Sequence, residues 1–295
     1  MTKPIKKAVF PVAGIGSRFL PATKASPKEM LPIVDKPLIQ YAVEEAISAG
    51  ITELIFVTSS SKRAIEDHFD SNFELEAKLI KSGHLEFLDI VRQILPKEVS
   101  CSYIRQPDTL GLGHAVLCAK PLINDQPFAV LLADDLITIE KKSCLAQMVA
   151  AYEKTKHSII AVQEIAPSES DKYGMVKLAD LDNGLGKIQQ IVEKPSSKNA
   201  PSNLGVVGRY ILTPAIFTYL ENTGAGIGGE IQLTDAIAEL LKNEPVYAWQ
   251  FTGTRYDCGN KLGYLEATVA FALNHPEVGA EFREFISSLP NARPV

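Results

Sequence analysis

Apolar and polar residues alternate in two different rhythms along this chain. Residues 7–13 and 53–58 are short apolar runs that read as strands, whereas apolar side chains recur at helical spacing over 37–49, just before Gly50. Further helices are predicted at 62–69 with Ser61 as the N-cap, at 73–95 as two pieces joined near Gly83, and at 113–119. Strands that alternate with helices are typical of a mostly parallel sheet covered on both faces.

The apolar run at 127–133 is the strongest candidate for a strand buried on both faces, and Asp134 and Asp135 follow it directly. A further strand is expected before this run, at 101–105. Beyond the run the connecting segments shorten, and we expect strands at 159–163, 174–178, 187–193, 204–212 and 245–252, and helices at 231–241, 262–274 and 277–289. Residues 194–203 form a loop rich in Pro and Ser, and a loose tail is expected after 289.

These elements predict a single α/β domain over 1–295, with a Rossmann-like mixed, mostly parallel central sheet flanked by helices and an inserted β-rich lobe. We expect the parallel sheet over about 5–135, the β-rich part over about 136–260 and the C-terminal helices over about 261–295. The chain contains no internal repeat that would favour a solenoid.

Charge and hydropathy exclude several classes of protein. The 295 residues include 30 Lys and Arg against 35 Asp and Glu, a net charge of −5. Proteins that coat nucleic acid or bind membrane surfaces need a positive field, so we expect neither partner. No apolar run approaches the roughly 18 residues of a membrane span. Basic residues stand where a signal peptide would carry its cleavage site, so we expect a cytoplasmic protein.

Several common catalytic motifs are missing from the sequence. The four cysteines are scattered without a CxxC pair, which argues against a structural zinc site, and the five histidines form no HExxH motif. The sequence has neither the GxSxG turn of serine hydrolases nor the GxxxxGK[ST] loop of P-loop ATPases.

A glycine-rich turn, residues 14–18 (GIGSR), follows the first predicted strand. Such a turn lets the backbone approach a nucleotide. NAD binding fits poorly, because the GxGxxG fingerprint requires Gly where Phe19 stands. Arg18, Lys24 and Lys28 lie within eleven residues, among prolines that keep the segment a stiff loop. This local basic cluster would suit a polyphosphate.

The stretch at 14–41, GIGSRFLPATKASPKEMLPIVDKPLIQY, resembles the signature of sugar-1-phosphate nucleotidyltransferases, G-x-G-[ST]-R-x-x-P followed by P-K-x-x-x-P. The resemblance is closest to the bacterial uridylyltransferases of that family. It spans about residues 5–275 and continues in Gln106, 111–115 (GLGHA), Asp134-Asp135, 193–195 (EKP), 203–210 (NLGVVGRY), 229–236 (GEIQLTDA) and 256–263 (YDCGNKLG). Ser17 stands where Thr is common, and Ala133 where relatives often have Gly or Pro.

The resemblance implies three catalytic cations and two metal ligands. Lys28 would bind the phosphates of UTP, Arg18 would lie near the leaving pyrophosphate, and Lys194 would grip the sugar phosphate. Asp134 and the distant Asp257 would hold Mg²⁺, which prefers few carboxylates plus phosphate oxygens. Because the attacking phosphate is already ionised at pH 7, we expect catalysis by positioning and charge neutralisation rather than by a general base.

The resemblance also implies how the sugar is held. Glu193 would accept hydrogen bonds from the glucose hydroxyls, with further contacts from the Gly174 amide and the Val206 backbone. Adjacent strand residues normally face opposite ways, so Glu193 and Lys194 can reach one ligand only at a bulge or a strand end. Pro195 is consistent with an ending strand.

For the base, the Gln106 amide offers one donor and one acceptor that match the uracil edge. The implied backbone contacts to the nucleotide come from Ala13, Gly14, Gly16 and Gly111. The role of Asp135 is open, and its backbone is a candidate for facing the sugar. We interpret the following as structural or surface residues outside the site: Glu230, Thr234, Asp235, His114 and Trp249.

The implied reaction joins UTP and α-D-glucose 1-phosphate to give UDP-glucose and pyrophosphate, by an in-line displacement without a covalent intermediate. A thymidylyltransferase is the alternative in the same class, because one C5 methyl is worth only about 1–3 kcal/mol in a pocket. A non-catalytic nucleotide-sugar-binding regulator is the alternative in another class, but it predicts loss of a charged catalytic residue, and all five are present. By analogy with dimeric and tetrameric relatives, we expect a homo-oligomer.

Overall fold

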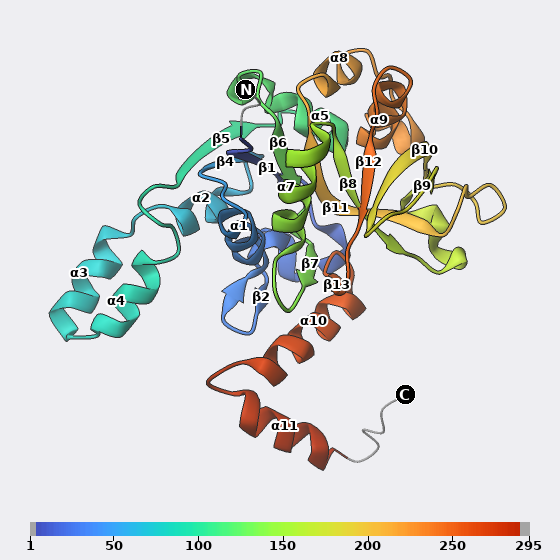
Figure 1. Ribbon diagram of the computed structural model, residues 1–295. Coiled ribbons are helices and arrows are strands. Elements are labelled where there is room, and N and C mark those ends of the chain that lie inside the picture. The colour runs from blue at the N-terminus through green and yellow to red at the C-terminus, as the bar shows by residue number, and fades with distance from the viewer. Residues whose placement is uncertain (1–3, 290–295) are drawn as a thin grey trace.

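A nine-stranded sheet runs through the centre of the molecule, whose computed structural model describes residues 4–289 (Figure 1). Four neighbouring strands are parallel: β1 (Lys7–Pro11), β4 (Glu53–Thr58), β5 (Ser100–Arg105) and β6 (Phe128–Leu131). The others are β8 (Ile159–Glu164), β9 (Gly174–Leu178), β10 (Leu185–Glu193), β11 (Leu204–Leu212) and β12 (Tyr247–Gln250). The strand order is β5-β4-β1-β6-β11-β8-β12-β10-β9.

The sheet is mixed, as predicted, but it is not mostly parallel. Of the eight neighbouring pairs in this order, four are parallel and four are antiparallel. The parallel arrangement dominates only in the β5-β4-β1-β6 half. The β-rich second half of the chain extends this same sheet through β11, which pairs antiparallel with β6.

Helices cover both faces of the sheet. On one face lie α1 (Leu38–Ser48), α2 (Arg63–Phe69) and α7 (Cys144–Thr155); on the other lie α5 (Leu112–Cys118), α6 (Lys120–Ile123), α8 (Ile216–Leu220) and α9 (Leu233–Leu241). Each face of the sheet forms a hydrophobic core with the helices that cover it. Successive strand side chains point to opposite faces, so Phe10 of β1 packs in the core with α1, α2 and α7, and Val9 packs in the core with α5, α6, α8 and α9. Both faces of the strands that carry the site are therefore fixed by packing.

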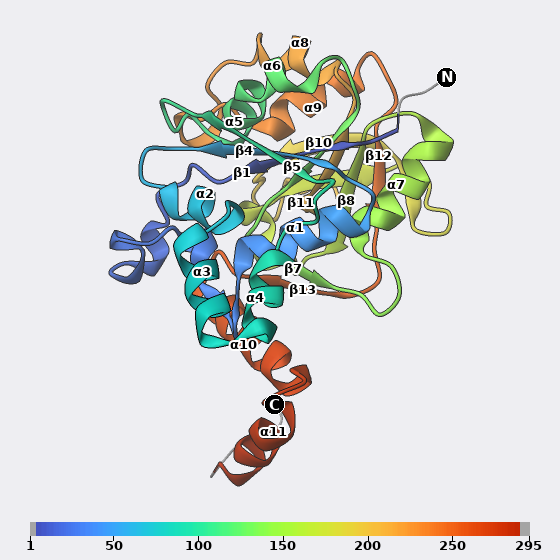
Figure 2. The same ribbon diagram turned by 90° about the vertical axis from the view of Figure 1, so that its left-hand side faces the viewer.

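Two helical pairs project from this body (Figures 1 and 2). α3 (Phe73–Ser82) and α4 (Leu85–Arg92) meet at Gly83, whose φ of 77° ends α3 in the left-handed conformation. α10 (Lys261–Asn274) and α11 (Gly279–Ser288) extend away from the sheet at the end of the chain. Several large apolar side chains on these helices are exposed, among them Phe73, Phe87, Ile90, Leu262, Leu265 and Phe285.

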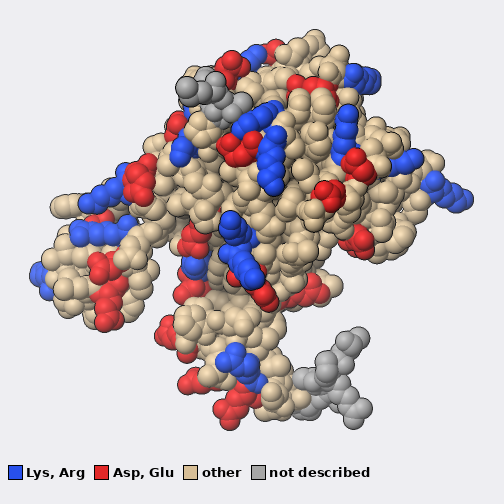
Figure 3. All heavy atoms as spheres, viewed as in Figure 1, with Lys and Arg blue, Asp and Glu red and all other residues tan. Residues whose placement is uncertain are grey.

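Two short antiparallel pairs lie outside the main sheet: β2 (Pro32–Ile33) with β3 (Lys36–Pro37), and β7 (Asp135–Thr138) with β13 (Thr254–Asp257). On the face shown in Figure 3, Lys and Arg side chains are interspersed with Asp and Glu side chains. Within residues 4–289, no helix has the length and apolar character needed to cross a bilayer.

The predicted N-cap of the second helix is wrong. α2 begins at Arg63, and Lys62 rather than Ser61 occupies the N-cap position, without a side-chain capping hydrogen bond. The Lys62 side chain turns inward instead and pairs with Glu29 at 2.8 Å. The side chain at the N-cap position is thus engaged in a tertiary ion pair, which local cap preferences could not reveal.

The predicted strand over 127–133 is shorter than expected. β6 ends at Leu131, and the amide of Asp135 donates to the carbonyl of Leu132 at 3.3 Å. Asp134 consequently lies in a turn between β6 and β7 rather than at the end of a strand. The loose tail that we expected lies at 290–295, outside the described residues.

Candidate active site

The basic segment after β1 folds as a series of short 3₁₀ turns, at Ser17–Phe19, Ala22–Lys24 and Lys28–Met30. It forms no α-helix, as its prolines predicted. Gly16 has a φ of 72°, and a Cβ built on it would lie 3.1 Å from the Cβ of Lys28. Glycine at this position therefore allows Lys28 to pack against the turn that follows β1.

Lys28 lies against the turn between β6 and β7. Its ammonium is 2.5 Å from Oδ2 of Asp134. Burial acts to raise the pKa of Asp134, but the Lys28 charge, the hydrogen bond from Lys28 and further hydrogen-bond and charge effects together outweigh it, so the pKa of Asp134 lies below its usual value. Burial likewise acts to lower the pKa of Lys28, yet Asp134 and then Glu29 raise it overall. Both groups are therefore charged at neutral pH.

The turn that carries Lys28 is anchored from its other side by a buried ion pair. Glu29 accepts a hydrogen bond from Lys62 at 2.8 Å, and both side chains are 2% exposed. Breaking such a pair by removing one partner typically costs about 3–5 kcal/mol. The residue next to Lys28, Glu29, is thus held by an ion pair to Lys62, which lies in the loop between β4 and α2.

Asp257 reaches the same place from the far end of the sequence. β13 pairs antiparallel with β7, and this register sets Asp257 opposite Asp135. The amide of Cys258 donates to the Asp134 carbonyl at 2.8 Å. Arg18 Nη1 donates to the Gly259 carbonyl at 3.2 Å. The structure therefore brings Arg18, Lys28, Asp134 and Asp257 together at one place.

Gly259 leaves room between the two carboxylates. A Cβ built on this residue would lie 2.9 Å from Asp257 Oδ1 and 3.0 Å from Asp134 Oδ2. Both carboxylates therefore border one small space. Across residues 4–289, no group of three or more His, Cys, Asp and Glu side chains is arranged to hold a metal. Two carboxylates with phosphate oxygens and water suit Mg²⁺, so the residues present fit this ion.

The expected sugar-phosphate residues lie at the end of a strand, as predicted. β10 ends at Glu193, and Lys194 follows with a φ of 44°, in the left-handed region. The Lys194 amide donates to the Tyr173 carbonyl at 3.0 Å, and its ammonium lies 3.4 Å from Glu193 Oε1. This change in backbone direction lets Glu193 and Lys194 face one cavity.

That cavity, of about 270 Å³, is lined by both carboxylates and by the expected sugar-binding residues. Its lining includes Asp134, Asp257, Gly174, Glu193, Lys194 and Val206. Two residues interpreted above as lying outside the site, Glu230 and Thr234, also line it. Oγ1 of Thr234 lies 3.0 Å from a Cβ built on Gly174. The sequence signal for Glu230 and Thr234 was the 229–236 segment of the resemblance.

The residues expected to bind the nucleotide lie at the carboxyl ends of parallel strands. Ala13 and Gly14 follow β1, and Gln106 follows β5. Gln106 is buried, and its Nε2 donates to the Gly111 carbonyl at 3.2 Å and lies 3.0 Å from His114 Nδ1. His114 thus has a structural role, as we interpreted it. Gln106 and Gly111 are in contact with each other. Gly14 is exposed and follows β1, which is separated from β5 by β4 in the sheet.

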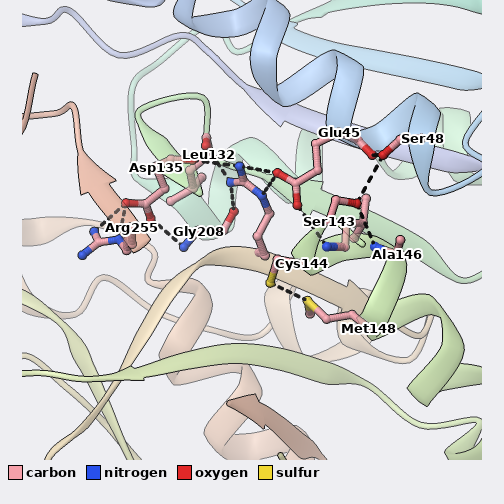
Figure 4. Close-up of polar contacts among 12 residues, drawn as sticks. Glu45, Ser48, Leu132, Asp135, Ser143, Cys144, Ala146, Met148, Gly208 and Arg255 are labelled. Atoms are coloured by element: carbon pink, nitrogen blue, oxygen red, sulfur yellow. Dashed lines mark hydrogen bonds and ion pairs between the residues drawn. The ribbon is translucent and has the colours of Figure 1, made fainter. Parts of the chain in front are cut away.

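Asp135 also lines the cavity, and its carboxylate is held there by other groups of the protein. It accepts hydrogen bonds from Arg255 at 2.6 Å and from the Gly208 amide at 2.6 Å (Figure 4). The Asp135 carbonyl, which we considered as a sugar contact, accepts a hydrogen bond from Arg209 at 2.8 Å. Arg255 also donates to the Tyr173 hydroxyl at 3.2 Å. Sequence reasoning missed Arg255 and Arg209, because each finds its partners through long-range contacts.

Comparison with known proteins gives consistent matches over the whole site. The family model described as Nucleotidyl transferase matches residues 7–273. The UTP–glucose-1-phosphate uridylyltransferase of Pseudomonas aeruginosa is 52% identical over 265 residues, which is 90% of this chain and 95% of that protein. A UTP-bound UGPase from Acinetobacter baumannii has a TM-score of 0.91 and 47% identity, and the match covers 97% of this chain and 100% of that chain.

A UDP-glucose pyrophosphorylase solved in complex with UDP-glucose has a TM-score of 0.84 and 48% identity, covering 92% of this chain and 100% of that chain. The matched span of the family model contains every residue of the candidate site, from Ala13 to Gly259. The fold is therefore that of an α/β nucleotidyltransferase with a mixed sheet. The chain belongs to the nucleotidyl transferase family, among its UTP–glucose-1-phosphate uridylyltransferases.

Proposed function

We propose that this protein transfers the uridylyl group of UTP to α-D-glucose 1-phosphate and releases pyrophosphate, with Mg²⁺ held by Asp134 and Asp257. The similar proteins carry the name of this activity, and solved relatives bind UTP and UDP-glucose. One observation carries the assignment to these residues. The basic turn with Lys28 and the two carboxylates meet at Gly259, beside the cavity lined by Glu193 and Lys194.

The reaction needs two polyanions to meet. A phosphate oxygen of glucose 1-phosphate attacks the α-phosphorus of UTP, a new P–O bond forms, and the bond to the bridging oxygen of pyrophosphate breaks. Lys194 binds the phosphate that attacks, Lys28 binds the phosphates of UTP, and Arg18 lies near the pyrophosphate that leaves. Each cation lowers the repulsion between the two substrates and stabilises charge in the transition state. No proton has to be removed from the nucleophile, so no general base is required.

Asp134 and Asp257 are the residues that would hold the metal, which when bound neutralises phosphate charge. Lys28 is now paired with Asp134 at 2.5 Å. A bound triphosphate offers Lys28 a second anion, which leaves the Asp134 carboxylate free to bind a cation. The two ionised side chains therefore keep each other in place near their ligands.

The remaining residues orient the substrates. Glu193 accepts hydrogen bonds from the glucose hydroxyls, and the amide of Gly174 and the backbone of Val206 provide further contacts at the cavity wall. Gln106 reads the uracil edge beside Gly111, whose φ of 104° keeps the backbone close to Glu230. Ala13, Gly14 and Gly16 provide the turn along the triphosphate.

Pyrophosphate release tests the function directly. The purified protein is mixed with Mg²⁺ and glucose 1-phosphate, and either UTP or dTTP is added. We expect release with both substrates present and none when glucose 1-phosphate is omitted. The kcat/KM for UTP should exceed that for dTTP by at least about tenfold, because dTTP carries an additional C5 methyl and lacks the 2′ hydroxyl. A preference for dTTP would support a thymidylyltransferase. Binding of UDP-glucose without any release would support a non-catalytic regulator.

We also propose that the protein forms a homo-oligomer in the cytoplasm. The exposed apolar side chains on α3, α4, α10 and α11 offer surface for a second copy of the chain. The four cysteines are unpaired, which is compatible with a reducing compartment.

A further inference from the structure

Arg209 lies in β11, and its buried guanidinium contacts the turn that carries Asp134. Its side chain is 1% exposed. It donates from Nε to Glu45 Oε2 at 2.9 Å, and from Nη1 and Nη2 to backbone carbonyls. The carbonyls are those of Leu132 at 3.0 Å, Gly208 at 2.9 Å and Asp135 at 2.8 Å. The planar fork of this side chain thus holds several acceptors in one arrangement.

Two of these carbonyls flank Asp134 in the sequence. The turn runs from Leu132 to Asp135, and the amide of Asp135 donates to Leu132 at 3.3 Å. The turn is joined to β11 as well, because Gly208 donates to the Asp135 carboxylate at 2.6 Å and accepts from the Leu132 amide at 2.9 Å. Its backbone is therefore fixed on both sides of Asp134, whose carboxylate points instead to Lys28 and Gly259.

Arg209 is itself anchored to the helices that cover this face of the sheet. Glu45 lies on α1, and its side chain is 8% exposed. One of its carboxylate oxygens pairs with Arg209 at 2.8 Å, and the other accepts the amide of Leu145, in α7, at 3.0 Å. The guanidinium therefore has a rigid support on the opposite side from the cavity.

We infer that Arg209 is a positioning residue for Asp134: by holding the carbonyls of Leu132 and Asp135 it keeps the Asp134 carboxylate beside Gly259, where it and Asp257 would hold a divalent cation. This inference rests on the proposed function, because it takes Asp134 as a metal ligand. Glu45 keeps the guanidinium in place and does not touch the turn directly. A buried ion pair alone can often be replaced by apolar residues of similar volume with little loss of stability. An apolar residue in place of Arg209 could not donate hydrogen bonds to the carbonyls that Arg209 contacts, and these hydrogen bonds would be lost.

The test compares three variants with the wild type. Arg209→Met removes the charge and the donors, Arg209→Lys keeps the charge near Glu45 but loses the fork, and Glu45→Gln keeps the fork but removes the ion pair. Lys7→Met is the matched control, because Lys7 is 4% exposed and donates to the Leu122 carbonyl at 2.6 Å, at the amino end of β1. Loss of stability is expected in all four and is recorded as the melting temperature.

The decisive readout is the gain in UTP affinity that Mg²⁺ provides, measured by calorimetry as the ratio of the dissociation constants in EDTA and in Mg²⁺. We expect this ratio to fall about tenfold in Arg209→Met and Arg209→Lys, the effect of removing a partner that orients a metal ligand, with the dissociation constant in EDTA unchanged. Glu45→Gln is expected to lose at most threefold, and Lys7→Met none. If Arg209→Met does not fold, Arg209→Lys gives the answer.

A wild-type ratio in both Arg209 variants would overturn the inference, and so would an equal decrease in Lys7→Met. Either result would leave the proposed function intact, because it requires only that the wild type binds UTP and turns it over. A wild-type protein that does not bind UTP would instead overturn the proposed function, and the inference with it.

Discussion

Asp134→Asn is expected to lower kcat by about 10²–10³-fold without unfolding the protein. Asparagine has the same shape as aspartate, so the turn between β6 and β7 keeps its backbone hydrogen bonds. The substitution removes the negative charge that lies 2.5 Å from Lys28 and 3.0 Å from the Cβ position of Gly259. The site then offers a divalent cation one carboxylate instead of two. Steady-state kinetics over a range of Mg²⁺ concentrations measures both the loss of kcat and the higher Mg²⁺ requirement.

A surface aspartate provides the control for this experiment. Asp35 has a side chain that is 59% exposed and pairs with His275 at 3.1 Å, away from the cavity. Asp35→Asn should therefore keep wild-type kcat and Mg²⁺ dependence. Wild-type turnover in Asp134→Asn at low Mg²⁺ would show that Asp134 is not a metal ligand.

Lys194→Met is expected to lower kcat/KM for glucose 1-phosphate by about 10²–10³-fold, because a charge-assisted contact to the attacking phosphate is lost. The KM for UTP should remain within about threefold of the wild type, since Lys28 and Arg18 bind the other substrate. Methionine keeps the length and the apolar part of the side chain. The same initial-rate experiment, with each substrate varied in turn, gives both values.

The neighbouring Lys172 separates a local role from a general effect of positive charge. It lines the same cavity, but it is 61% exposed and pairs with Glu169 at 2.9 Å. Lys172→Met is expected to change kcat/KM by less than about threefold, as for most exposed ion pairs. If Lys172→Met and Lys194→Met lose activity equally, the cavity acts as a diffuse cationic field and Lys194 has no special position.

Much of the architecture is visible in the sequence because it depends on local periodicity. The strands at Glu53–Thr58, Gly174–Leu178 and Leu204–Leu212 coincide with the predicted segments. The helices α6, α7 and α8 were overlooked, and for the longest of them, α7, the signals are present in the sequence. α7 follows Ser143, whose side chain accepts the Ala146 amide at 3.3 Å, and its apolar residues recur at helical spacing.

The order and direction of the strands were harder to predict from the sequence. Whether β11 lies antiparallel to β6, or β12 parallel to β8, depends on contacts between segments far apart in the sequence. Periodicity of two residues describes either arrangement equally well. For this reason the apolar pattern led to a mostly parallel sheet, whereas the sheet is evenly divided.

For the candidate site, the sequence identified residues through motifs but not through their supports. The strand end at Glu193 and Lys194 could be deduced because two adjacent residues had to face one ligand. The buried partners Glu45 and Arg209 are 164 residues apart, and no local pattern links them. The same holds for Asp135 and Arg255, which are 120 residues apart. Supporting residues of this kind become visible only when the fold brings them together.

Exchange of labelled pyrophosphate into UTP tests most directly whether the uridylyl group passes straight from one substrate to the other. The wild-type protein is incubated with Mg²⁺, UTP and radiolabelled pyrophosphate, with and without UDP-glucose. We predict exchange only when UDP-glucose is present, because pyrophosphate must attack a bound nucleotide sugar to regenerate UTP. Exchange at the catalytic rate in the absence of any sugar nucleotide or sugar phosphate would reveal a uridylyl-enzyme intermediate, and it would contradict direct transfer between the Lys28 and Lys194 sides of the site.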